Sequence, residues 1–327
     1  MTKLVSVLMP AYNAQRWIEQ TLYSALNQTW KHLEIIVVDD GSQDQTTDVV
    51  RALRSPRIKL ICQNNGGPCV ARNHAYAHAQ GDYIQWLDAD DLLAPEKIAR
   101  QIERLQAHGD DMAVAAGPTG VFRELHTKAR FSPDSCWQDL APRELLIRKF
   151  TDNAHIVIHA WLIGRRLADA AGPWDVRLQK TDADGEYSSR MVGQSSGMLF
   201  VPDARCYYRK GIAGSLSATR SHMDQERLLL VQLFDNLLAL ENSEQTRQAC
   251  ARWLQLWAMG YYMVHAQTPQ TVVKLVERFN LPPVRIVVPA KFRVAETVLG
   301  WRGAVRMRLA LASLRRMHHH NADEAAS

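Results

Sequence analysis

The sequence predicts an α/β fold with a mostly parallel central sheet, followed by a helical extension at the C-terminus. Three observations support this prediction. Short apolar runs suited to strands alternate with helix-like segments over residues 1–110. Two of these runs end in carboxylates, and a third leads into a glycine turn. Beyond residue 220, apolar residues recur at helical spacing instead.

Composition limits the class of protein. The chain has 327 residues, 46% hydrophobic and 22% charged, as in ordinary globular proteins. It lacks the roughly eighteen consecutive apolar residues of a membrane span, and its N-terminal apolar run is too short for a signal peptide, so we expect a cytoplasmic protein. The five scattered cysteines have no metal-ligand spacing and are expected to be reduced. The net charge of +5 is mild, and we expect no nucleic-acid partner.

The first two strands are expected at residues 4–9 and 33–38. Asn13 suits the N-cap of the helix that follows the first strand. The second run is almost continuously apolar, which is typical of a strand buried in a parallel sheet. It ends in two acids, Asp39 and Asp40, so a carboxylate is expected at the end of this strand.

Two more strands are expected at residues 58–61 and 83–87. The first of them leads into Gly66-Gly67, which permits backbone geometry closed to other residues, and Pro68 can open the next helix. Strand and helix in this rhythm predict βαβ units and a mostly parallel sheet.

Three acids, Asp88, Asp90 and Asp91, follow the fourth strand at once. Carboxylates at the end of such a strand face the crevice where open α/β sheets bind ligands. Acids this close repel one another unless a cation lies among them, and a divalent metal that carries a diphosphate would supply it. The alternative is that Asp90 or Asp91 caps the next helix, in which Pro95 is an early position.

Four motifs in order and at the usual separations resemble family 2 glycosyltransferases. They are residues 5–13 (VSVLMPAYN), 34–42 (EIIVVDDGS), 66–73 (GGPCVARN) and 81–91 (GDYIQWLDADD). The resemblance implies a single Rossmann-like glycosyltransferase A domain, a nucleotide-sugar donor that is usually UDP-linked, a divalent metal and inversion at the anomeric carbon. It also implies a nucleotide-sugar-binding half over 1–110 and an acceptor-binding half over 111–220, with 221–327 as the helical extension.

The resemblance assigns roles to the residues on the nucleoside side. Pro10, Ala11 and Tyr12 would line the nucleoside pocket, and Asp40 would meet the base. Arg72 would approach the diphosphate as a fork donor, although an exposed helix arginine is the alternative.

The resemblance also assigns a separate role to each residue of the acid motif. Asp88 and Ala89 would lie near the ribose, and Asp90 would hold the metal, Mn²⁺ or Mg²⁺. Asp91 is expected to be structural.

Residues 181–190 contain the candidates for the general base. The chemistry needs one carboxylate near the acceptor hydroxyl. When Arg190 is aligned with the arginine that commonly follows in the family, Asp184 falls on the base, with Asp182 as the second choice and Glu186 as a further rival. The chain departs from the family pattern at Ala183, where a glutamate is usual. An acidic helix N-terminus is the alternative for the whole cluster.

A late basic stretch also resembles the family, in which such a loop folds over the donor. Arg209 and Lys210 would meet phosphate oxygens, and Gly211 and Gly214 would permit a moving lid. An ordinary basic surface loop is the alternative.

The segment after residue 220 carries no motif. Helices are expected over 228–240 and 251–264. Residues 291–316 hold seven basic residues against one acid in an amphipathic pattern, which predicts either peripheral contact with an anionic membrane or docking on the catalytic domain. The polar tail after His318-His319-His320 is expected to be disordered.

The sequence therefore predicts a metal-dependent inverting glycosyltransferase of the hexosyltransferase type. It would act on a glycan or lipid-linked acceptor in surface polysaccharide or glycan biosynthesis. A non-catalytic nucleotide-sugar-binding or scaffold protein with the same fold is the alternative, supported by Ala183. A nucleotidyltransferase is disfavoured because residues 10–13 replace the glycine-rich basic loop expected after its first strand.

Overall fold

The computed structural model describes residues 2–154, 156–179, 181–211, 223–265 and 270–284, together with residues 300, 303 and 307. The packing of Cα atoms divides the chain into two compact units, Met1–Glu241 and Asn242–Ser327. The boundary expected at residue 220 lies outside the described residues. Helix α8 (Met223–Leu240), which that boundary would assign to the extension, packs on α7 (Ala183–Gln194) and α5 (Pro142–Asp152) of the first unit.

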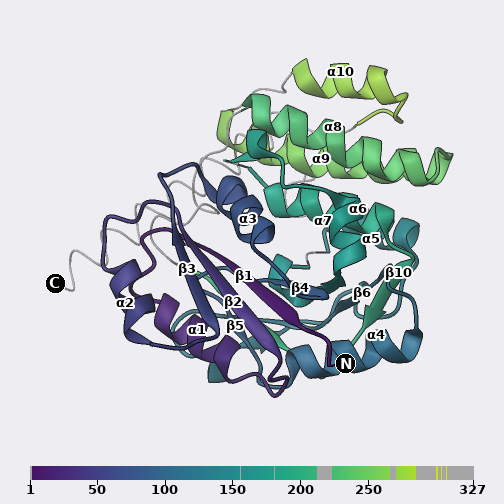
Figure 1. Ribbon diagram of the computed structural model, residues 1–327. Coiled ribbons are helices and arrows are strands. Elements are labelled where there is room, and N and C mark those ends of the chain that lie inside the picture. The colour runs from purple at the N-terminus through teal and green to yellow at the C-terminus, as the bar shows by residue number, and fades with distance from the viewer. Residues whose placement is uncertain are drawn as a thin grey trace. The chain divides into compact units, whose positions relative to one another are not determined.

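The first unit is built on a seven-stranded sheet of order β10-β6-β9-β4-β1-β2-β3 (Figure 1). Its neighbouring strands are parallel except where β9 pairs with β4 and β6, which confirms the predicted mostly parallel sheet. The strands are β1 (Val5–Ala11), β2 (Leu33–Asp39), β3 (Ile58–Cys62), β4 (Tyr83–Trp86), β6 (Ala113–Ala116), β9 (Trp161–Gly164) and β10 (Gly197–Phe200).

A second, four-stranded sheet of order β5-β11-β7-β8 was not predicted from the sequence. Its strands are β5 (Leu92–Leu93), β11 (Cys206–Arg209), β7 (Thr119–Phe122) and β8 (Arg130–Phe131). Two of them have only two residues, too few for an apolar alternation to be visible. Because β5 follows directly after the acid motif, this sheet ties that motif to β11.

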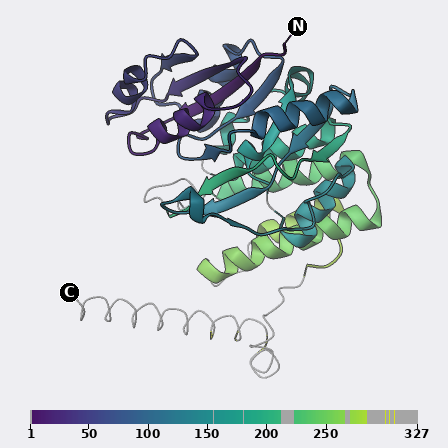
Figure 2. The ribbon, with the colours of Figure 1, turned by 90° about the horizontal axis from the view of Figure 1, so that it is seen from below.

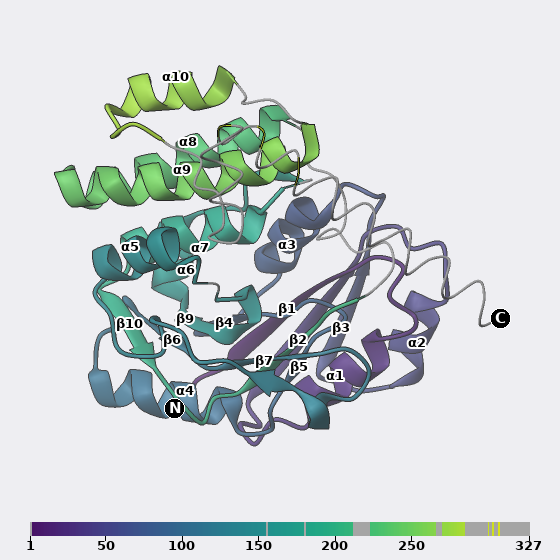
Figure 3. The same ribbon diagram turned by 180° about the vertical axis from the view of Figure 1, so that it is seen from behind.

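Helices cover both faces of the large sheet. On one face, α1 (Ile18–Leu26) and α4 (Lys97–His108) contribute to one buried cluster with the strands, and Figure 2 shows them in purple and blue. The opposite face carries α3 (Pro68–Ala77) and α6 (Arg165–Ala171), with α7 packed on α6 (Figures 1 and 3). Helix α2 (Thr46–Ala52) lies beside β3. The short 3-10 turns are η1 (His126–Lys128), η2 (Ile158–Ala160) and η3 (Val176–Leu178).

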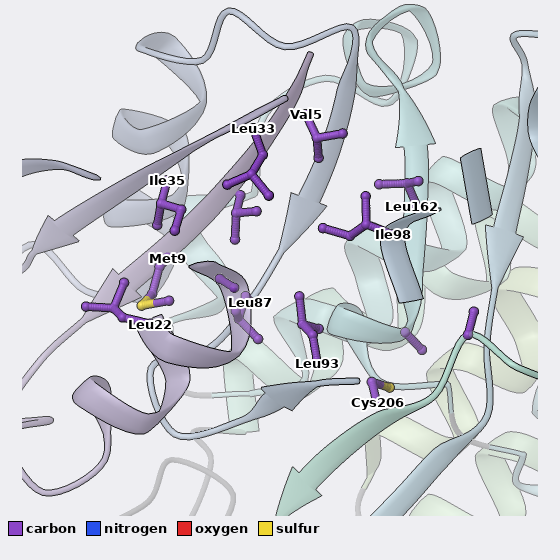
Figure 4. Close-up of a cluster of buried hydrophobic side chains, with 14 of the residues drawn as sticks. Val5, Met9, Leu22, Leu33, Ile35, Leu87, Leu93, Ile98, Leu162 and Cys206 are labelled. Carbon is purple, nitrogen blue, oxygen red and sulfur yellow. The ribbon is translucent and has the colours of Figure 1, made fainter. Parts of the chain in front are cut away.

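The core follows from the period of two along each strand. Val5, Val7 and Met9 of β1 point into one cluster, where they meet Leu22 of α1 and Ile98 of α4 (Figure 4). All five side chains are fully buried. Burial of this kind stabilises a fold by roughly 1.5–3 kcal/mol for each large side chain, so the two helices are fixed against the strands that lead to the acids.

A buried polar network fills the gap where β4 and β9 separate. Their pairing is confined to two residue pairs, Tyr83–Gly164 and Ile84–Ile163. Beyond them, Gln85 Nε2 donates to the His159 carbonyl at 3.0 Å, and Lys97 Nζ donates to the side-chain oxygens of both Gln85 and Gln101. Burial lowers the pKa of Lys97 to about 7. The network satisfies backbone groups that the sheet leaves open and so anchors the segment before the acid motif.

The second unit contains two described helices, α9 (Glu244–His265) and α10 (Gln270–Phe279). The helices predicted over 228–240 and 251–264 correspond to α8 and α9. Of the predicted basic helix 291–316, only residues 300, 303 and 307 are described, and the tail from 318 lies outside the described residues. Among the helices that can be described, none is both long enough and apolar enough to cross a bilayer.

A glycine before β4 provides a test of the fold. Gly81 N donates to Ser6 Oγ at 2.8 Å, and a Cβ at Gly81 would lie 2.5 Å from Ser6 N. We expect Gly81→Ala to lower the free energy of unfolding by about 1–3 kcal/mol, measured in urea. The matched control is Gly193→Ala in α7, where nothing lies within 4 Å. It should be neutral or more stable by up to about 1 kcal/mol, and equal losses in both variants would contradict this packing.

Candidate active site

Parallel pairing brings three of the sequence motifs to one edge of the sheet. Strand β1 lies between β2 and β4, with Ala11 in register with Asp39 and Leu8 in register with Trp86. Asp40 N donates to the Ala11 carbonyl at 2.8 Å. The predicted nucleoside residues, the acid pair after β2 and the acid motif after β4 therefore meet where open α/β sheets bind ligands.

The nucleoside side combines an exposed ring with a buried acid pair. Ala11 is buried and Pro10 half-buried, while the ring of Tyr12 is 52% exposed and open to a ligand. Asp40, predicted to meet the base, is buried and already engaged. Its oxygens accept hydrogen bonds from Gln63 Nε2 at 2.7 Å and from the backbone amides of Gly66 and Gly67 at 2.8 Å each. Asp40 therefore shapes the glycine turn.

Asp39 has the unpartnered carboxylate oxygen of the pair. Its Oδ2 accepts from Ser42 N at 3.1 Å, whereas its Oδ1 is buried and finds no hydrogen-bond partner among the described residues. The sequence reasoning missed this residue. The signal was available, because adjacent residues at the end of a strand point to opposite sides and only one of the two acids can face a given site.

The glycine turn is tied to the second half of the domain by Gln179. The backbone of Gly67 has φ +89°, a conformation that favours glycine, and the Gln179 side chain occupies the space of a Cβ there. Gln179 Nε2 donates to the Gly66 carbonyl at 2.7 Å, and its Oε1 accepts from Cys69 N at 3.3 Å. No motif in the sequence indicated this contact.

Arg72 lies between two of the predicted carboxylates. Its guanidinium contacts Asp88 Oδ1 at 2.8 Å through Nη2 and Asp184 Oδ1 at 3.1 Å through Nη1. The same group lies over the ring of Trp174, 4.3 Å from its centroid. Arg72 is 6% exposed. The expected exposed helix arginine is therefore absent at this position, and the guanidinium already has two anionic partners.

The acid motif separates into open and internal carboxylates. Asp88 and Asp90 are half-buried, Ala89 is buried between them, and Asp91 is 1% exposed. Asp91 Oδ1 accepts from Arg209 N at 2.7 Å, and its Oδ2 lies 3.1 Å from His159 Nδ1. Burial alone would lower the pKa of His159, but the Asp91 carboxylate raises it well above its usual value. Asp91 is thus a structural residue.

Asp90 carries the strongest electrostatic perturbation of the open acids. Burial, with the negative charges of Asp91 and Asp88, raises the pKa of Asp90 to about 7. A carboxylate in this setting favours a cation nearby. In the parts of the chain that are described, no three His, Cys, Asp or Glu side chains are grouped to hold a metal ion. A Mg²⁺ or Mn²⁺ ion that arrives with a diphosphate needs only one or two protein carboxylates, so Asp90 fits such an ion.

Arg209 supports the backbone of the acid motif. Its Nε donates to the Asp90 carbonyl at 2.8 Å and its Nη2 to Gln20 Oε1 at 2.7 Å. The guanidinium lies 4.2 Å from the ring centroid of Trp17 and 4.4 Å from that of Phe122. Arg209 is 3% exposed, so the group predicted to meet phosphate has protein partners in this structure.

The predicted lid, which follows Arg209, is only partly within the described residues. Lys210 is exposed, and residues 212–222, including Gly214, lie outside the described residues.

The candidates for the base have different partners. Asp182 caps α7, where its Oδ1 accepts from Gly185 N at 2.8 Å. Glu186 is 2% exposed and pairs with Arg190 at 2.7 Å. Asp184 contacts Arg72 and keeps 36% of its side chain exposed. Burial raises the pKa of Asp184 to about 6, although the Arg72 charge acts against this shift. Asp184 is the acid of this group that combines an open surface with the sheet edge.

Comparison with known sequences identifies the family of the chain. The sequence model of glycosyl transferase family 2 matches residues 6–171. The glycosyltransferase GlyG of Streptococcus pneumoniae is 30% identical over 238 residues, which cover 69% of this chain and 77% of GlyG. The chain therefore belongs to glycosyl transferase family 2.

One further relative and one solved structure resemble the chain. The putative teichuronic acid biosynthesis glycosyltransferase TuaG of Bacillus subtilis is 43% identical over 103 residues, 31% of this chain and 41% of TuaG. The chain spans less than half the length of several curated relatives that it matches. The crystal structure of S. aureus TarS 1-349 with UDP-GlcNAc aligns with a TM-score of 0.66 and 18% identity, over 84% of this chain and 80% of that one. This likeness confirms the predicted glycosyltransferase A fold.

Proposed function

We propose that the protein is an inverting, metal-dependent glycosyltransferase that moves a sugar from a UDP-linked donor to an acceptor hydroxyl in surface polysaccharide synthesis. The observation that carries the proposal is the meeting of Asp184 with Asp88 through one buried arginine at the carboxyl edge of the sheet. Family membership supports the reaction class. TarS bound to UDP-GlcNAc and the name of TuaG support the donor class and the pathway type.

The donor would lie along the edge formed by β1, β2 and β4. The proposal assigns the nucleoside to Pro10, Ala11 and Tyr12, whose exposed ring can stack on a base. The unpartnered Oδ1 of Asp39 would accept a hydrogen bond from an N–H of the nucleobase, a role that the family resemblance gave to Asp40.

The diphosphate end of the donor would lie beside the acid motif. Asp88 and Ala89 are assigned to the ribose side, and Asp90 would hold the divalent metal. When bound, such a metal supplies positive charge that stabilises the leaving nucleoside diphosphate. Because Arg209 Nε donates to the carbonyl of Asp90, the backbone that carries this carboxylate is held in place.

The chemical step assigns one proton transfer to Asp184. The acceptor hydroxyl oxygen forms a bond to the anomeric carbon while the bond from that carbon to the diphosphate oxygen breaks. The hydroxyl proton passes to the Asp184 carboxylate, and the electron pair of the broken bond leaves with the nucleoside diphosphate. Attack from the face opposite the leaving group inverts the configuration.

Replacement of Asp184 tests the base assignment. We expect Asp184→Asn to bind UDP like the parent chain and to lose at least about 100-fold in sugar transfer, because the amide cannot accept the proton. Release of UDP from a panel of UDP-sugars with Mn²⁺, followed by product analysis, measures this.

The control is Asp182→Asn, which keeps an oxygen that can cap α7. Because asparagine caps a helix about as well as aspartate, it should change the stability by less than about 0.5 kcal/mol and the rate by less than tenfold. Turnover of Asp184→Asn near that of the parent would refute the base assignment, and a parent chain that binds UDP yet never releases it from any UDP-sugar would support the non-catalytic alternative.

The pH profile provides a second test. A base must be ionised, and the pKa of Asp184 is raised to about 6 by burial. Below this value the ionised fraction falls tenfold for each pH unit, so kcat/KM for the acceptor should rise with pH and level off at about pH 7. Initial rates between pH 5 and 8, with UDP affinity measured in parallel, separate this effect from donor binding. A flat profile over this range contradicts the assignment.

The two acids after β2 should separate binding from stability. Asp39→Asn is expected to weaken UDP binding by roughly 10- to 100-fold, the value of a hydrogen bond to a charged group. Its stability should stay equal or rise, because the replacement removes a buried charge and the amide oxygen can still accept from Ser42 N. Asp40→Asn should lose about 1–3 kcal/mol of stability, since an amide cannot accept from both turn amides. Calorimetric UDP titration and urea unfolding check both variants. The reverse pattern would assign the contact with the nucleobase to Asp40.

A further inference from the structure

Helix α3 of the first half holds a loop of the second half. Asn73 Nδ2 donates to the Trp174 carbonyl at 2.9 Å, and Trp174 N donates back to Asn73 Oδ1 at 2.8 Å. This pair of bonds fixes the backbone of Trp174 next to α3. Trp174 lies in the connection that leads to α7, ten residues before Asp184 in the first turn of that helix.

The ring of Trp174 is a rigid platform. It is 2% exposed and stacks on Tyr187 of α7, with the ring centroids 4.2 Å apart and the planes 3° from parallel. Trp86 meets it edge-on at 5.2 Å. The Arg72 guanidinium lies over this same ring. A guanidinium is attracted to the face of an aromatic ring, more strongly when water is excluded, so the plane of the Arg72 guanidinium is fixed by packing.

The Arg72 guanidinium contacts two carboxylates from distant parts of the chain. Nη2 holds Asp88 at 2.8 Å and Nη1 holds Asp184 at 3.1 Å. The Nε atom is buried and makes no hydrogen bond within the described residues. The ion pairs use two of the five N–H donors of Arg72, and with 7% of its side chain exposed the guanidinium is largely shielded from a donor at the open edge of the sheet.

We propose that Arg72 is a positioning residue, which holds Asp184 at a fixed distance from Asp88 on the donor side, rather than a ligand of the donor diphosphate. This proposal rests on the proposed function of Asp184. It assigns to Arg72 a coupling between the two halves of the domain: the side that binds the donor sets the place of the group that takes the acceptor's proton.

Several other charged or titratable groups face Asp184, and Arg72 is the cation in direct contact with it among the described residues. Loss of Arg72 would leave burial and nearby acids to act on this carboxylate, which raises its pKa further. The other groups are Cys69 of α3, Asp88 after β4, Asp182 before α7, His159 of η2 and Lys149 of α5, and Glu226 of α8 contacts the same loop at Thr181.

Arg72→Gln tests the proposal through two measurements, the pH profile of the rate and the affinity for UDP. Loss of a diphosphate ligand and loss of a positioning residue should change these two differently. For a positioning residue, kcat should fall by at least about 100-fold, and the acid limb of the rate profile should move up by about one pH unit. The affinity for UDP should stay within about threefold of the parent, since the group does not touch the donor. Rates use the UDP-sugar from which the parent releases UDP fastest, and UDP affinity is measured by calorimetry.

Arg190→Gln is the matched control. Arg190 also lies on the aromatic cluster, 5.5 Å from the Tyr187 ring, and pairs with Glu186 on α7, but it does not touch Asp184. It should lower stability while it leaves the acid limb in place. Arg72→Lys keeps the charge but cannot bridge two carboxylates, and it should fold, bind UDP and turn over slowly even if Arg72→Gln does not fold.

Two results would overturn the proposal. One is a loss of more than tenfold in UDP affinity with an unmoved acid limb in Arg72→Gln or Arg72→Lys, which would make Arg72 a diphosphate ligand. The other is normal turnover in these variants. Failure of the proposed function has a different signature, because then Asp184→Asn itself keeps its turnover. When Asp184→Asn is inactive, either of the two results above in Arg72→Gln overturns the positioning role alone.

Discussion

The parallel pairing of β1 with both β2 and β4 is the constraint on which the site depends. It sends three segments of the chain to one edge of the sheet, with Ala11 in register with Asp39. The apolar cluster beneath β1 and the polar network of Lys97 hold these strands against α1 and α4. Because the core fixes the strands, the side chains at their ends inherit fixed positions.

The second organising effect is the distribution of negative charge. Acids gather at this edge, and the fold compensates most of them with specific partners. Asp40 accepts from the amides of a turn, and Asp91 is held by His159 and the backbone of Arg209. The compensated acids shape the site. Asp90 is left with a raised pKa, and this is the electrostatic basis of the metal site proposed there.

Much of the fold was predictable from short stretches of sequence. The strands and the acids at their ends follow from local apolar runs, and the mostly parallel pairing follows from the alternation of strands and helices. The second sheet was missed, because β5 and β8 have two residues each and pair only with strands distant in the chain. The 3-10 turn that carries His159 was also not predicted, because three residues are too few to show a helical period.

The sequence by itself determined which residue types stand at the sheet edge, because strand period and motif spacing are local properties. Only the tertiary structure decided which of them keep an unpartnered oxygen or an exposed side chain. Asp39 rather than Asp40 keeps a free oxygen, Asp184 rather than Asp182 reaches the edge, and Arg72 contacts carboxylates from two other segments. The physical reason is that a side chain's hydrogen-bond partners and burial come from residues far away along the chain, and these appear only when the halves pack together.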